Sequence, residues 1–157
     1  MSSDPNDLLA KELAKLAALG GSVGQILSGA GDAGNVAEHA TSLGVRFAMR
    51  FMPTERYTEK LSLAMPPDKA LKIGCSALSK LGSLQKQDEQ SPYPVLTAVI
   101  GSGMMNLNPA VVYFEILEAT DSKCEITLTG AAKEGLIKQH TAEKAVKRAV
   151  NEIRNLS

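Results

Sequence analysis

Residues 56–65 and 124–132 alternate apolar and polar side chains with a period of two, and this pattern constrains the fold more than any other feature of the chain. Such alternation indicates a β-strand with one face in a core and the other toward solvent. Two further apolar runs, 95–101 and 110–119, are separated by turn-forming residues. The sequence therefore predicts four strands, of which the last three form an antiparallel meander.

Two segments carry apolar residues at helical spacing. The first opens on Pro67 and Asp68, which suit the first turn of a helix, and closes at Gly82. The second opens on Thr141 as the predicted N-cap. Its apolar stripe consists of Ala142, Ala145, Val146, Ala149, Val150 and Ile153. The order β-α-β-β-β-α predicts an α+β two-layer sandwich, in which both helices cover one face of a four-stranded antiparallel sheet.

The first part of the chain is rich in Ala, Gly, Ser and Leu, which predicts a helical, Gly-rich N-terminal arm at 1–54 and an α+β domain at 55–157. Leucines at helical spacing predict a first helix between Pro5 and Gly20. A second helix is predicted over 35–51, with a strand at 45–52 as the alternative. These helices, or a second copy of the chain, would cover the open face of the sheet.

Three landmarks in the second part of the chain carry a resemblance. They are a helix at PPDKALKIGCSALSKLG, a hairpin at IGSGMMNLNPAVVYFEI, and the helix that follows GAAKEGLIKQHT. In this layout residues 56–156 resemble small, uncharacterised bacterial α+β domains of helix-grip or TATA-binding-protein-like topology. The resemblance contains no catalytic signature and leaves residues 1–54 without a counterpart. It implies a module that binds apolar ligands or partner proteins, although a fold does not fix a function.

Charge and terminal sequence narrow the classes of partner. Lys plus Arg is 17 and Asp plus Glu is 17, so the formal net charge is zero, which argues against a strongly basic nucleic-acid binder. No apolar run approaches the roughly 18 residues of a transmembrane segment. The N-terminus has no basic segment followed by an apolar one, so we expect a cytoplasmic protein without a secretory signal.

A turn rich in glycine and asparagine separates the second and third predicted strands, and it carries one candidate contact. Met104 and Met105 are flexible apolar side chains that would adapt to a ligand or partner, and Asn106 and Asn108 lie beside them. A plain hairpin turn is the alternative. Under the last helix, Phe114 and Val146 would border a small apolar ligand if the side chains around them leave a cavity.

Basic residues form a second candidate surface, made of Arg46, Arg50, Lys147 and Arg148. Arginine interleaved with Phe and Tyr in RFAMRFMPTERY would suit RNA or an anionic membrane surface. The same spacing is also that of a solvated helix face, so nucleic acid is not an expected partner.

Glu134 and His140 precede the last helix and form a third candidate, either a polar active site or a helix cap. His39 and His140 are the only histidines, and neither stands in an H-x-x-x-H or H-E-x-x-H pattern. The sequence therefore predicts neither a metal site nor a cofactor. We expect a non-enzymatic interaction or apolar ligand-binding module that self-associates. An enzyme near Glu134 and His140 is one alternative, and weak binding to nucleic acid or anionic membrane surfaces is another.

Overall fold

The fold was analysed in a computed structural model that describes residues 8–9, 11–12, 53–85, 93–102, 108–134 and 139–157. Its elements follow the order β1 (Thr54–Leu63), α3 (Pro67–Leu81), β2 (Ser83–Leu84), β3 (Leu96–Ser102), β4 (Asn108–Ala119), β5 (Cys124–Lys133) and α4 (Thr141–Leu156). The strands form one antiparallel sheet in the spatial order β1-β5-β4-β3-β2. The alternatives at 45–52 lie outside the described residues.

The sheet has five strands, so the prediction of four was wrong. The additional strand, β2, holds only Ser83 and Leu84, which pair with Val99 and Ala98 of β3. Two residues are too few to produce a visible alternation, and this strand forms because α3 ends beside the edge of β3. The α+β class, the antiparallel meander and both helices are as predicted.

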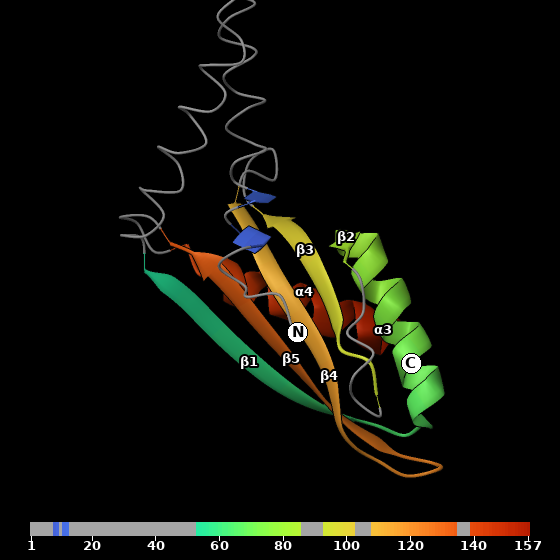
Figure 1. Cartoon of the computed structure of the whole chain (residues 1–157). Helices are drawn as coiled ribbons and strands as arrows, with labels where there is room; N and C mark the ends of the chain where they lie inside the picture. The colour runs from blue at the N-terminus through green and yellow to red at the C-terminus, as the bar shows by residue number, and fades with distance from the viewer. Residues whose placement is uncertain (1–7, 10, 13–52, 86–92, 103–107, 135–138) are drawn as a thin grey trace, which may run out of the picture.

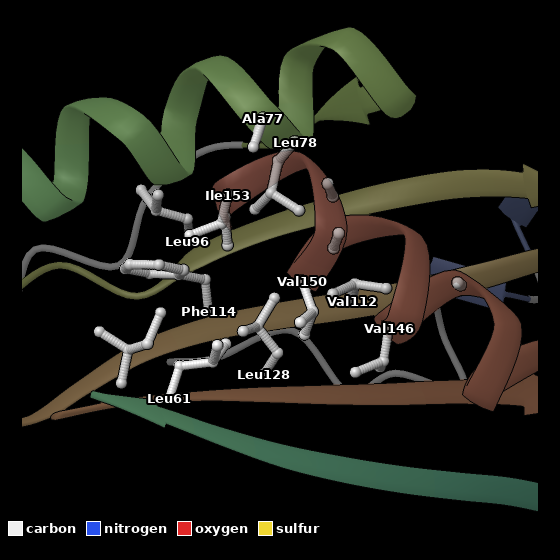
Figure 2. Close-up of a cluster of buried hydrophobic side chains, with 14 of the residues drawn as sticks. Leu61, Ala77, Leu78, Leu96, Val112, Phe114, Leu128, Val146, Val150 and Ile153 are labelled. Carbon is white, nitrogen blue, oxygen red and sulfur yellow. The ribbon is translucent and has the colours of Figure 1, made fainter. Parts of the chain in front are cut away.

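Both helices lie on the same face of the sheet (Figure 1). The C-terminal helix α4 runs across the strands on this face. One apolar core fills the space between the layers, and the apolar stripe predicted for α4 is buried throughout. Figure 2 shows how side chains from α3, α4 and the strands interlock, including Leu78, Leu96, Phe114, Val146 and Ile153.

Two glycines fix how closely the helices approach the sheet. A Cβ atom at Gly130 of β5 would lie 2.7 Å from Val146 Cγ2 and 2.9 Å from the Ala142 carbonyl oxygen of α4. A Cβ atom at Gly74 of α3 would lie 2.9 Å from the Phe114 ring. Both distances are below ordinary van der Waals contact, so at these two points the layers touch without room for one more methyl group.

The opposite face of the sheet, termed here the outer face, carries a second and smaller apolar cluster. Val99 and Val111 point to this face because their neighbours in β3 and β4 point to the core. Leu9, in a helical segment near the N-terminus, is fully buried against both valines, and Leu8 and Tyr113 pack at the edge of the cluster. The expectation that the N-terminal helix covers the open face of the sheet is confirmed for these residues.

Thr127 of β5 also faces away from the helices, and its Oγ1 is buried without a hydrogen-bond partner among the described residues. Thr127→Val is expected to raise the free energy of unfolding by about 1 kcal/mol, because it removes an unsatisfied hydroxyl at nearly constant volume. Urea denaturation measures the change. Thr129→Val is the matched control and should not stabilise, since the Thr129 hydroxyl bonds to Thr58 at 3.1 Å. Equal effects of the two substitutions would contradict this assignment.

Candidate functional site

The N-terminal end of α4 is held by two carboxylates from distant parts of the chain. Glu134, which follows β5 and is 5% exposed, accepts hydrogen bonds from the backbone N–H groups of Gln139 (2.5 Å) and Thr141 (2.9 Å). Glu55 Oε2, on β1, accepts one from the Ala142 N–H at 2.8 Å. The first N–H groups of a helix have no partner within the helix, and the dipole there favours negative charge.

The prediction that Thr141 caps α4 was therefore wrong. Thr141 is the first helical residue, and His140 occupies the cap position without a side-chain capping bond. The backbone of His140 is left-handed, with φ at 53°. Carboxylates from outside the helix replace the local cap, so Glu134 serves as the cap and His140 does not.

The hydrogen bonds at Glu134 set its charge state. Burial alone raises the pKa of this carboxyl, but the N–H groups of Gln139 and Thr141 favour the ionised form and outweigh burial. The pKa of Glu134 is consequently held below its ordinary value. A carboxylate that stays ionised and uses both oxygens on backbone N–H groups is a structural anchor rather than a proton donor.

Three potential metal ligands gather on the solvent side of this anchor. The His140 imidazole is 60% exposed and lies between two carboxylates, with its Nδ1 3.4 Å from Glu55 Oε1 and 3.6 Å from Glu143 Oε2. Donor atoms of the three side chains all lie within 4.8 Å of one another. Sequence reasoning missed this group because Glu55 precedes the other two by more than eighty residues and no short motif contains all three.

Of the four residues of the predicted basic surface, Lys147 and Arg148 are described, and both lie on α4 with partners in this chain. Lys147 Nζ pairs with Glu143 Oε1 at 2.6 Å and stands 5.9 Å from the centre of the Tyr57 ring. Arg148 donates to the Gly101 carbonyl oxygen at 3.1 Å. Arg46 and Arg50 lie outside the described residues. The lysine charge is thus balanced by a carboxylate, which weakens its attraction for phosphate.

The residues predicted to contact a ligand fall in different places. Phe114 and Val146 are fully buried in the core between the layers. Asn108 opens β4, and its side-chain amide donates to Gln139 Oε1. Met104, Met105 and Asn106 lie outside the described residues. Among the described residues of this set, Phe114 and Val146 belong to the same packed core, and Asn108 lies outside it.

In the outer-face cluster, the N-terminal residues Leu8 and Leu9 pack on the sheet. Its strand residues, Val99, Val111 and Tyr113, were not singled out from the sequence, although they belong to strands that were predicted. Their signal was a departure from alternation, since 110–114 is apolar on both faces. A strand that is apolar on both faces is buried on both.

No protein-family model and no curated protein matches the sequence. Among solved structures, the Zhui aromatase/cyclase from Streptomyces sp. R1128 matches 66% of this chain and 93% of its own at 10% identity, with a TM-score of 0.39. A conserved protein of unknown function from Enterococcus faecalis matches 66% of this chain and 71% of its own at 8% identity, with a TM-score of 0.40. Norcoclaurine synthase from Thalictrum flavum matches 70% of this chain and 90% of its own at 10% identity, with a TM-score of 0.37. Likeness at this level carries no inference about ligand or reaction.

Within the described part of the chain, the helices are too short or too polar to cross a bilayer. Two features of the described residues are candidates for function, and they lie on opposite faces of the sheet. One is the polar end of α4, and the other is the apolar cluster around Leu9 on the outer face.

Proposed function

We propose that this protein is a non-enzymatic interaction module whose outer sheet face binds an amphipathic helix. The observation that carries the proposal is the complete burial of Leu9 in one apolar cluster with Val99 and Val111. Contact between a leucine and two valines on a sheet is a hydrophobic docking mode, in which the apolar face of a helix fills a shallow surface. A fully buried leucine contributes about 1.5–3 kcal/mol to such a contact.

The partner in this proposal is a second copy of the same chain. The proposed arm at 1–54 provides the helix, and the proposed domain at 55–157 provides the sheet. In the structure Leu9 packs on the sheet of its own chain. Exchange of this same contact between two identical copies would produce a dimer without any new interface, as swapping of an identical element does.

A small apolar ligand between α4 and the sheet is the second candidate. It is favoured by the composition of the layer, because Phe114 and Val146 lie among side chains that are apolar throughout. Met104, Met105 and Asn106, which lie outside the described residues, stay predicted contacts for a ligand or partner. The close approaches at Gly74 and Gly130 count against it, since they leave no space for a ligand at those two points.

Leu9→Asp tests the first candidate in the full-length chain. Sedimentation velocity is expected to give a dimer for the wild type and a monomer for the variant, because a carboxylate cannot be buried between two valines without a partner. Leu117→Asp is the matched control, since Leu117 is 50% exposed on the β4–β5 hairpin, and it should leave the dimer intact. A wild type that sediments as a monomer at all concentrations would refute self-association.

A further inference from the structure

Two of the three side chains at the solvent side of the α4 N-terminal end are carboxylates. Each binds a protein group through one oxygen and directs the other oxygen toward the third side chain, His140. Glu55 commits Oε2 to the Ala142 N–H group and directs Oε1 toward His140. Glu143 commits Oε1 to Lys147 and directs Oε2 toward the same imidazole. Partners of this kind, one step removed from the ligand atoms, orient the ligands of protein metal sites.

The distances between these donors distinguish a metal site from a hydrogen bond. Nδ1 of His140 lies 3.4 and 3.6 Å from the two carboxylate oxygens, whereas a charge-assisted N–H···O bond is about 2.7–2.9 Å long. In a tetrahedral zinc site with ligands at about 2.0–2.1 Å, neighbouring donor atoms are about 3.4 Å apart. The two distances from Nδ1 therefore suit an imidazole and a carboxylate bound to one ion better than they suit a proton shared between them.

The charge around this point also favours a cation. Glu55, Glu134 and Glu143 place three carboxylates around His140, and the ammonium groups of Lys147 and Lys144 balance part of their charge. The positive end of the α4 dipole opposes a cation, but it amounts to about half a charge and is already in contact with Glu55 and Glu134. A divalent ion would meet a net negative surrounding.

We propose that Glu55, His140 and Glu143 form a zinc-binding site. One imidazole nitrogen and two carboxylate oxygens are donors that Zn²⁺ accepts, and three protein ligands leave a fourth position for water or a ligand atom. The site ties β1 to the first turn of α4 on the face opposite the Leu9 cluster. It stands independently of the proposed helix docking.

Isothermal titration of the full-length chain with Zn²⁺ tests the site, and the visible absorption of added Co²⁺ reports tetrahedral geometry. We expect one ion per chain. His140→Gly should weaken binding at least tenfold without unfolding the protein, since glycine adopts the left-handed backbone at this position freely. Glu143→Gln should also weaken it at least tenfold. Glu152→Gln, which removes a carboxylate paired with Lys80 near the other end of α4, should leave affinity unchanged.

Two results would overturn the site. One is the absence of saturable Zn²⁺ binding by the wild type under conditions in which circular dichroism shows it folded. The other is binding that is equal in the wild type, His140→Gly and Glu143→Gln, because the ion would then be held by other residues. Octahedral rather than tetrahedral Co²⁺ spectra would contradict the proposed geometry.

Discussion

Phe114→Ala is expected to lower the free energy of unfolding by about 3–5 kcal/mol, the usual cost of deleting a fully buried aromatic ring. Phe114 is the largest fully buried side chain, and its ring fills the space beside Gly74 on α3. The side chains around Phe114 come from the helices and the strands of one packed core, so they would fill only part of the volume that the ring leaves. Chemical denaturation monitored by circular dichroism provides the measurement.

The same variant tests the candidate ligand site between α4 and the sheet. If Phe114 borders a ligand cavity in the wild type, its removal should cost well under 3 kcal/mol and should change the affinity for apolar probes that already bind. If the ring is a core element, the wild type binds no such probe and only the variant, with its new cavity, acquires an apolar site. We expect the second result. Ile116→Ala, at the partly buried edge of the same strand, is the matched control and should cost less.

Glu134→Ala is expected to lower the free energy of unfolding by about 2–4 kcal/mol. It leaves two backbone N–H groups at the start of α4 without acceptors, and hydrogen bonds to a charged group are each worth about 1.5–3 kcal/mol. Glu125→Ala is the control, since that carboxylate pairs with Lys123 on the exposed β4–β5 hairpin, and its loss should cost much less than the loss of Glu134. Equal losses would show that Glu134 does not anchor the helix.

The anchor also predicts a response to acid. The pKa of Glu134 is lower in the folded protein than its ordinary value, because N–H groups stabilise the ionised form against the effect of burial. The stabilisation is therefore complete above the ordinary pKa and is lost as the pH falls through the lower folded value. The wild type should lose stability faster than Glu134→Gln as the pH falls below the ordinary range of a glutamate carboxyl. Parallel pH profiles would contradict the shift.

Most of the α+β layer could be predicted from the sequence because its signals are local. The alternation around Leu61 and Ile126 marks strands, and the stripe from Ala142 to Ile153 marks the buried face of α4. The four predicted strands do not include β2, because two residues define no period. The open face of the sheet was foreseen as a surface that needs cover, and Leu9 is a residue that covers it.

The features of the candidate site were harder to predict because they depend on register between distant strands. Glu55 reaches the start of α4 because it pairs with Ala132 of β5, two residues before Glu134. That pairing brings a residue of β1 beside His140 and Glu143, and no spacing along the chain contains it. Thr141 looked like a cap from local sequence alone, and two carboxylates delivered by the sheet displaced it from that role.

Cross-linking between two different variants tests the central claim most directly. Leu9→Cys and Val111→Cys are made in separate full-length chains in which Cys75 and Cys124 are replaced, then mixed and oxidised. The account predicts a covalent dimer of twice the 16.6 kDa chain mass, because the helix of one copy docks on the outer face of the other. A disulfide that forms only when both cysteines share one chain, and leaves the mixture monomeric, would contradict it.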